Sequence, residues 1–217
     1  MQQHLNPNSP FFHEERHASL ALFAGEPITI CGTGTLGGNL AENLARMGFT
    51  RLKLIDKDRV EMRNLSTQPF SRAEVGAPKA RALANTLYRA VQAKVEPVVI
   101  ELTRTNSQSL LKGSTLVVDA FDNRDARQAV SEATQALSIP CLHVGFSPDG
   151  LYGNGLWEPG YRVPQDVPGD PCDYPLTRPL AQILAALAVR AICDFFRECQ
   201  SKDFELTWND LKVAYLS

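Results

Sequence analysis

The sequence predicts an α/β fold in which a mostly parallel sheet has helices on both faces and continues into a β extension near the C-terminus. Short apolar stretches alternate with stretches of helical periodicity along most of the chain, as in repeated β-α units. The apolar stretches, such as Leu116 to Asp119, are continuous, which is typical of strands buried on both faces. A glycine-rich turn, Gly32 to Gly38, joins the first expected strand to the first expected helix.

The first β-α-β unit contains the strongest functional signal. Ile28 to Cys31 reads as a strand, a helix is expected to about Met47, and Arg51 to Asp56 reads as a second strand that ends in an acid. Together with the glycine-rich turn, this order is typical of a Rossmann-like unit.

Three glycines of the turn and the acid define a candidate nucleotide site. Gly32, Gly34 and Gly37 would let backbone N–H groups approach phosphates, and the helix dipole adds to the attraction. Asp56 follows Gly37 by 56 − 37 = 19 residues, where a carboxylate that binds ribose is expected. Glycines also serve tight turns alone, but the strand before them and the acid after them favour nucleotide binding.

Helices and strands continue to alternate after this unit. Pro78 and apolar residues at four-residue spacing predict a helix to about Ala93. The next expected elements are a β-like stretch from Lys94 to Leu102, a strand from Leu116 to Asp119, a helix from Asn123 to Leu137 and a strand from Pro140 to Gly145.

The composition changes at Ser147. Residues 147–179 hold seven of the 14 prolines, too many for regular structure, so we expect a long crossover loop close to the site. An apolar helix from Leu180 to about Phe196 resumes the core, and its most apolar part, Leu180 to Val189, is too short to cross a bilayer. Alternating apolar residues between Phe204 and Leu216 predict a late edge strand or hairpin.

Length, charge and cysteine content narrow the class of protein. We expect residues 1–26 to form an arm with a short amphipathic helix from His13 to Phe23, and residues 27–217 to form a single nucleotide-binding domain. A net charge of −2 gives no reason to expect a nucleic-acid or acidic-membrane partner. No apolar run near the N-terminus resembles a signal peptide. Five scattered cysteines without a Cys-x-x-Cys pair indicate the reducing cytoplasm and do not support structural zinc.

Four motifs occur in an order that resembles the ThiF/MoeB/HesA family, the bacterial relatives of ubiquitin-activating enzymes. They are Leu54 to Glu61, Asn64 to Gln68, Gly76 to Ala80 and Val117 to Asn123, and the resemblance extends over roughly Ile28 to Phe196. It implies ATP- and Mg²⁺-dependent adenylation of a C-terminal carboxylate, often that of a ubiquitin-like protein or a peptide, with release of pyrophosphate. It also implies a homodimer.

The resemblance also implies roles for single residues. Lys79 would bring a positive charge to the phosphates, and Asp119 would bind Mg²⁺ through a carboxylate, a hard oxygen ligand for a hard ion. Asn64 and Gln68 would position the triphosphate as neutral hydrogen-bonding groups, and Asp122 would contribute to nucleotide binding. Taken singly, Asp56 and Asp119 could instead cap helices, and Lys79 could be an ordinary surface lysine.

One residue departs from the family pattern. Where the family reads Asn-Leu-Asn-Arg-Gln, Thr67 occupies the position of the phosphate-binding arginine. A neutral hydroxyl does not neutralise developing charge, so either a nearby arginine compensates or adenylation is weakened. Arg63 and Arg72 are the nearest candidates in the sequence, and Arg16 could reach a partner subunit's site from the N-terminal segment.

Some family members use a cysteine nucleophile in the loop before the last core helix. Cys172 occupies that region, where its thiolate could attack an acyl adenylate, although Asp170 and Asp173 disfavour a thiolate. Cys31 and Cys141 lie in expected strands and read as core residues. His143, in an apolar strand, reads as a hydrogen-bonded core histidine rather than a base.

Two other functions stay open at this stage. A degenerate subunit could keep the fold and support another protein's activity, and Thr67 is the best evidence for that alternative. An NAD-dependent oxidoreductase would account for the glycine turn and Asp56, but it leaves Lys79 and the Asn64 to Gln68 stretch without a role.

Overall fold

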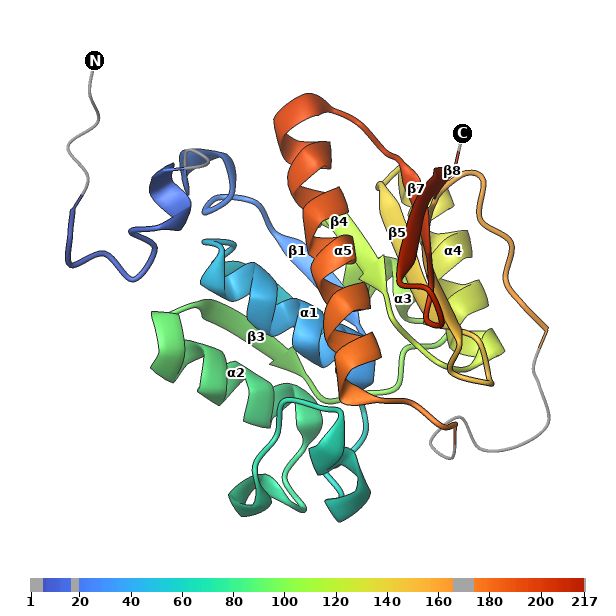
Figure 1. Cartoon of the computed structure of the whole chain (residues 1–217), viewed down its shortest axis with the longest axis horizontal. Coiled ribbons are helices and arrows are strands. Elements are labelled where there is room, and N and C mark those ends of the chain that lie inside the picture. Colours follow the sequence, from blue (N-terminus) through green and yellow to red (C-terminus); the bar gives the residue numbers. More distant parts are fainter. Residues whose placement is uncertain (1–5, 17–19, 166–173, 217) are drawn as a thin grey trace.

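A computed structural model describes residues 6–16, 20–165 and 174–216, and it confirms the predicted α/β fold. Its eight strands form one sheet in the order β3-β2-β1-β4-β5-β6-β7-β8 (Figure 1). The strands are β1 (Ile28–Cys31), β2 (Arg51–Ile55), β3 (Lys94–Val98), β4 (Leu116–Asp119), β5 (Cys141–Phe146), β6 (Tyr152–Trp157), β7 (Asp203–Thr207) and β8 (Lys212–Leu216).

The sheet has a parallel half and an antiparallel half. β3, β2, β1, β4 and β5 pair in parallel, whereas β6, β7 and β8 are antiparallel to their neighbours. The strand order reverses between β1 and β4, so the loops that follow these two strands meet at the carboxyl edge of the sheet. Ligands of open α/β sheets bind at such a reversal.

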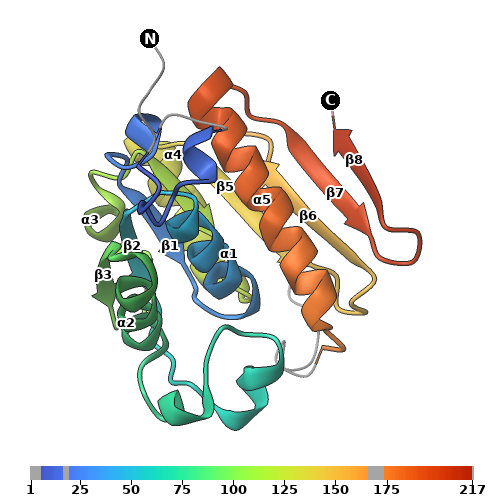
Figure 2. The same cartoon turned by 60° about the vertical axis from the view of Figure 1, so that its left-hand side comes forward.

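Helices cover both faces of the parallel half. The helices are α1 (Thr35–Arg46), α2 (Lys79–Val91), α3 (Ser107–Leu111), α4 (Arg124–Leu137) and α5 (Arg178–Glu198), with short 3-10 helices at Glu14–Arg16, Leu20–Leu22, Met62–Ser66 and Arg72–Glu74. α1, α2 and α5 lie together on one face and α3 and α4 on the other (Figure 2).

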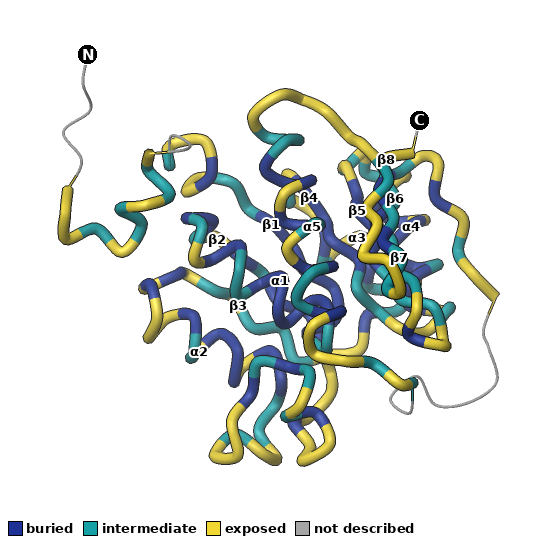
Figure 3. Tube along the Cα trace, viewed as in Figure 1, coloured by how far each residue is buried: buried dark blue, intermediate teal, exposed yellow. Residues whose placement is uncertain are grey.

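Two apolar clusters follow from this layering. The larger cluster joins α1, α2 and α5 to the sheet, and the smaller one joins α3 and α4 to the opposite face. Consecutive residues of β4 divide between them: Val118 faces the larger cluster and Val117 the smaller one. Figure 3 shows that the central strands are buried, whereas the outer surfaces of the helices and β8 are exposed.

Three expectations about the elements were wrong in part. The proline-rich stretch from 147 to 179 contains a regular strand, β6. Its two buried glycines face the larger apolar cluster, where a Cβ on Gly153 would lie 2.5 Å from the Leu184 side chain and a Cβ on Gly155 would lie 2.3 Å from the Phe204 ring. The strand is glycine-rich because α5 and β7 pack directly onto it.

The second correction concerns the last core helix. α5 spans 21 residues, so by length and composition it could cross a membrane, and the argument from a short apolar run was wrong. Its apolar residues nevertheless pack on α1 and on the sheet, as in a core helix. The third concerns the N-terminal segment, where short 3-10 helices stand in the described part of the expected amphipathic helix.

Candidate functional site

The glycine turn is held in place by Asp56 at the end of the neighbouring strand. Oδ2 of Asp56 accepts hydrogen bonds from the backbone N–H of Thr33 at 2.7 Å and from its hydroxyl at 2.8 Å. Oδ1 accepts from the N–H of Asp58 at 2.8 Å. Although these contacts occupy much of the carboxylate, Oδ1 keeps an acceptor position, so Asp56 is still able to bind a ribose hydroxyl.

Close packing makes the glycines of the turn necessary. A Cβ on Gly37 would lie 1.9 Å from the carbonyl oxygen of Gly32, and Gly32 itself has a φ of +86°. No side chain caps the start of α1 at Gly34. The positive end of this helix is therefore available to an anion.

Lys79 lies in the same network, at the first residue of α2. Its backbone N–H donates to the carbonyl of Asp58 at 2.9 Å, and its Nζ lies 3.6 Å from Oδ2 of the same residue. The lysine is buried although its carboxylate partner is largely exposed. The glycine turn, Asp56 and Lys79 are thus connected through Asp58.

The stretch from Asn64 to Gln68 packs against the start of α1. The hydroxyl of Thr67 lies 3.1 Å from that of Thr35, the first residue of the helix. The side-chain amide of Asn39 donates to the carbonyls of both threonines, at 2.6 Å to Thr35 and 2.8 Å to Thr67. The position that departs from the family pattern therefore lies beside the glycine turn.

The side-chain oxygens of Asn64 and Gln68 differ in whether they have a hydrogen-bond partner within the described residues. Oδ1 of Asn64 accepts from the N–H of Glu61 at 2.8 Å, which caps a 3-10 helix. The amide nitrogen of Gln68 lies 3.8 Å from the position a Cβ on Gly34 would take. Its buried Oε1 has no hydrogen-bond partner among the described residues. A bound water or a ligand donor beside the uncapped start of α1 could satisfy this acceptor.

Gln68 also lines a cleft of about 490 Å³ between α1, α2 and the start of α5. Glu42, Arg89 and Arg178 contribute charged side chains to the cleft. Among the predicted site residues that the structure describes, Gln68 alone lines it.

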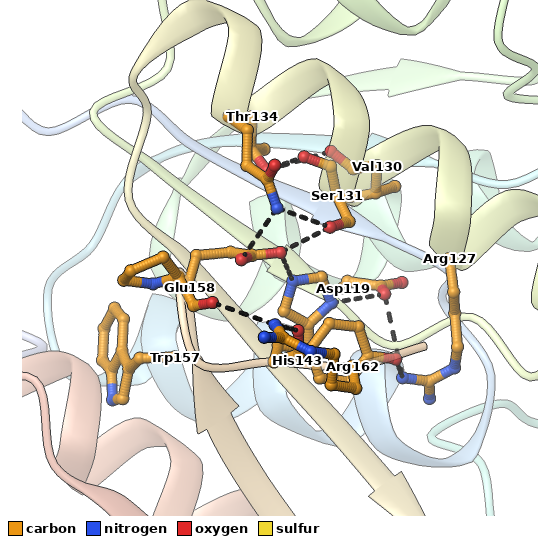
Figure 4. A network of polar contacts seen from close by, with 12 residues as sticks. Asp119, Arg127, Val130, Ser131, Thr134, His143, Trp157, Glu158 and Arg162 are labelled. Atoms are coloured by element: carbon orange, nitrogen blue, oxygen red, sulfur yellow. Dashed lines mark hydrogen bonds and ion pairs between the residues drawn. The ribbon is translucent and has the colours of Figure 1, made fainter. Parts of the chain in front are cut away.

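The acids that follow β4 have different environments. Asp119 is fully buried on the α4 face: Oδ1 accepts from the N–H of Phe121 at 3.1 Å, and Oδ2 lies 2.8 Å from Nδ1 of His143 and 3.7 Å from the guanidinium of Arg127 (Figure 4). Asp122, three residues later, is exposed at the carboxyl edge of the sheet. The predicted metal ligand Asp119 is thus enclosed by protein partners, whereas the exposed Asp122 is accessible to a ligand.

His143 is a buried core residue, as expected, but sequence reasoning missed its charged partners. Its Nε2 lies 3.2 Å from Oε1 of Glu158, so each ring nitrogen faces a carboxylate. Burial alone would lower the pKa of His143, but Cys141, Asp119 and Glu158 raise it to about 12. Burial opposes the charged form of Asp119 too, yet Arg127 and His143 hold its pKa below the usual value.

Two of the three arginines proposed to replace the missing family arginine contact other side chains, and the third is exposed. Arg63 pairs with Glu61, with 2.7 Å between Nε and Oε2, and Arg72 is exposed on its own 3-10 helix. The guanidinium of Arg16 stacks over the ring of Phe12 at 4.5 Å. Cys172 lies outside the residues that the structure describes.

The fold and this arrangement define a Rossmann-like α/β domain, and comparison with known proteins gives the family. The chain belongs to the ThiF family, whose model matches residues 13–155. It is 33% identical over 119 residues to the SAMP-activating enzyme E1 of Haloferax volcanii, covering 54% of this chain and 44% of that protein. It is 34% identical over 118 residues to the sulfur carrier protein adenylyltransferase of Thermus thermophilus, covering 53% and 43%. The chain thus spans less than half the length of these curated relatives.

Solved structures show the same fold. The crystal structure of E. coli MccB with ATP aligns with a TM-score of 0.78 at 17% identity, covering 97% of this chain and 72% of that one. The structure of TcdA (CsdL) aligns with a TM-score of 0.61 at 28% identity, covering 67% of this chain and 63% of that one.

The buried histidine predicts a pH dependence of stability. In the unfolded chain His143 releases its proton near pH 6.5, whereas in the folded protein it keeps the proton until a pH of about 12. Its contribution to stability is therefore complete below about pH 6.5 and is lost as the pH rises. Between pH 7 and 9 the unfolding free energy should fall, relative to His143→Gln, by up to about 1.4 kcal/mol per pH unit. Urea denaturation at several pH values measures this, and parallel curves for the two proteins would contradict it.

Proposed function

We propose that this protein binds ATP and adenylates the C-terminal carboxylate of a ubiquitin-like protein or peptide, releasing pyrophosphate. The observation that carries the proposal is the convergence of the glycine turn, Asp56 and Lys79 at the reversal of strand order, in a chain of the ThiF family. Relatives named as adenylyltransferases of sulfur carrier proteins support the same reaction class.

The reaction needs positive charge close to the phosphates. A carboxylate that attacks the α-phosphate approaches a polyanion, so repulsion must be offset while the groups are held in line. The uncapped start of α1 supplies N–H dipoles, and Lys79 supplies a cation at the start of α2. The unpaired oxygen of Gln68 can accept from a ligand donor or a bound water beside the turn.

The residues after β4 fit Mg²⁺ only if the nucleotide shares it. Among the described residues, no group of three or more His, Cys, Asp or Glu side chains could hold a metal ion. Mg²⁺ commonly binds one or two carboxylates together with substrate phosphates, and it would neutralise phosphate charge. We propose that the exposed Asp122 is the carboxylate that holds Mg²⁺. The buried Asp119, for which the resemblance implies this role, would instead shape the loop.

We further propose a cytoplasmic homodimer, as the resemblance implies. The buried free thiols of Cys31, Cys141 and Cys193 agree with a reducing compartment. A thioester or persulfide on Cys172 stays a prediction, and replacing this cysteine with alanine separates such a step from adenylation.

A degenerate subunit is the second candidate, and the neutral Thr67 favours it. The two functions are separated by titration calorimetry followed by isotope exchange. Binding of MgATP but not NAD, together with pyrophosphate exchange in the presence of a small ubiquitin-like carrier protein ending in glycine, supports the enzyme. Binding of MgATP without exchange for any carrier supports the degenerate subunit, and binding of NAD instead of ATP would overturn both.

Replacing Lys79 tests the cation at the phosphates. Lys79→Met keeps most of the buried stem but removes the charge, so pyrophosphate exchange should fall about a hundredfold or more. Lys57→Met is the matched control, because Lys57 lies nearby but is exposed and pairs with Glu101. Its exchange rate should stay within about threefold of the wild type. Equal exchange in Lys79→Met and the wild type would remove Lys79 from the site.

The two acids after β4 should respond differently to amide substitution. Asp122→Asn should abolish exchange and leave the unfolding free energy within about 0.5 kcal/mol of the wild type, because the side chain is exposed. Asp119→Asn should lower the unfolding free energy by about 3 kcal/mol or more, since it leaves His143 and Arg127 with one anion fewer. Full exchange in Asp122→Asn, measured over a range of Mg²⁺ concentrations, would return the metal to Asp119.

Restoring the family arginine tests the degenerate alternative. In Thr67→Arg a guanidinium would start beside the first residue of α1, where it can reach an anion bound to the glycine turn. If missing charge limits the rate, exchange should rise about tenfold or more. Thr35→Val is the control, since it removes the same hydroxyl pair without adding charge. A rise of the same size in both variants would show that charge is not the cause.

A further inference from the structure

The buried charges around His143 form a bridge between two segments that are far apart in the sequence. Asp119 ends β4, and Glu158 directly follows β6. The side chains of His143 and Asp119 are 0% exposed and that of Glu158 is 7% exposed, so solvent does not compete for their contacts. Two carboxylates accept but do not donate, so the ring donates from both nitrogens. The imidazolium therefore holds both acids at once (Figure 4).

The segment of residues 158–165 has three further anchors on the α4 side of the sheet. The ring of Tyr161 stacks on His143, with 3.6 Å between centroids and planes inclined by 7°. The hydroxyl of Tyr161 accepts from the guanidinium of Arg127 at 3.0 Å. Near the end of the segment, Arg124 donates to the side chain of Gln165. His143 and two arginines of α4 thus fix a segment that has no helix or strand of its own.

The other end of the bridge shapes the loop that carries Asp122. Asp119 accepts from the N–H of Phe121, which sets the turn after β4, and Asn123 then caps α4 by accepting from the N–H of Ala126 at 2.9 Å. Asp122 lies between these two fixed points. A change in the conformation of this loop therefore has a direct mechanical path to His143 and Glu158.

We propose that His143 is a positioning residue that couples the segment of residues 158–165 to the acidic loop of residues 120–123. Through this coupling, MgATP bound at residues 120–123 orders residues 158–165. That segment leads toward the crossover loop that we expect to meet the acceptor. This last step rests on the proposed function, whereas the coupling in the free protein does not. Histidine suits the task because its two donors point in different directions, and an amide side chain reaches only one of the two acids.

Two amide variants separate the two contacts in nucleotide-free protein. The amide nitrogen of asparagine takes the place of Nδ1, so His143→Asn keeps the bond to Asp119 and loses Glu158. The longer glutamine takes the place of Nε2, so His143→Gln keeps Glu158 and loses Asp119. Hydrogen-deuterium exchange in residues 158–165 should be faster in both variants, because both lose the ring on which Tyr161 stacks, and most in the first, which also loses Glu158. Exchange in residues 120–123 should be about tenfold faster or more in the second variant alone, as expected for the loss of one charge-assisted hydrogen bond.

The control keeps His143 and removes another partner of Glu158. Gln135 donates to Oε2 of Glu158 at 3.1 Å from the surface of α4, so Gln135→Ala should change exchange in residues 158–165 by less than about threefold. Exchange in α2 should be unchanged in every variant. The same acceleration throughout the chain in both His143 variants, or no acceleration in either segment, would overturn the proposal, because it would show a general effect on stability or none.

The nucleotide-dependent step is tested with MgATP as the probe. Calorimetry first establishes binding, and exchange is then measured with and without saturating MgATP. Slower exchange in residues 158–165 of the wild type, with at most a third of that change in His143→Asn, is the expected result. Binding without any change in the segment would refute the coupling and leave the proposed function intact. Absence of binding would refute the proposed function, and the nucleotide-free comparison would then decide the positioning role.

Discussion

The candidate site depends on the buried carboxylate of Asp56. It closes the glycine turn by accepting from the N–H and hydroxyl of Thr33, and it sets the next turn by accepting from the N–H of Asp58. Asp58 in turn lies against Lys79, so two neighbouring carboxylates connect three segments that are separate in the sequence. Hydrogen bonds to an ionised acceptor are stronger than those between neutral groups. The glycine turn and the start of α2 are therefore held together by contacts within the protein itself.

A second carboxylate organises the opposite face of the sheet. Asp119 ends β4 at the same level as Cys31 at the end of β1, because these two residues are partners in the parallel register. Its side chain points to α4, where Arg127 and His143 balance its charge. Burial of an unpaired charge is costly, so this acid remains ionised only because cations from α4 and β5 surround it. Asp56 and Asp119, which lie at the same edge of the sheet, thus have different structural roles.

Local sequence patterns were sufficient to predict the fold wherever each pattern depends only on residues close together in the chain. The strand and glycine turn around Gly32 and the acid at Asp56 are local, and they lie where the sequence placed them. β6 could not be recognised in the same way, because its glycines are explained by Leu184 and Phe204, which come from later elements. Strand propensity describes a residue's own preference and not the space that its neighbours leave.

The same limit applies to the candidate site. The motif Val117 to Asn123 shows two acids three residues apart, but which of them is exposed depends on the face of β4 that each residue occupies and on the partners found there. His143 and Glu158 are separated by 15 residues, and nothing in the spacing indicates that they meet. Antiparallel pairing of β5 with β6 brings them together, since His143 is opposite Leu156 and Glu158 follows two residues later.

The uncharged side chain at Thr67 affects how the candidate site could bind a polyphosphate. Thr67, Thr35, Asn39 and Gln182 form a continuous hydrogen-bonded set that joins α1 to α5, with Gln182 donating to Asn39 at 2.9 Å. Such a set fixes the start of α1 rigidly, so the backbone dipoles there are already oriented and need no reorganisation when charge develops. Preorganised dipoles can compensate in part for an absent guanidinium, but they carry no net charge. Under the proposed function, Lys79 and a metal ion shared with the nucleotide would have to supply the net positive charge, so the reaction would depend more strongly on each of them.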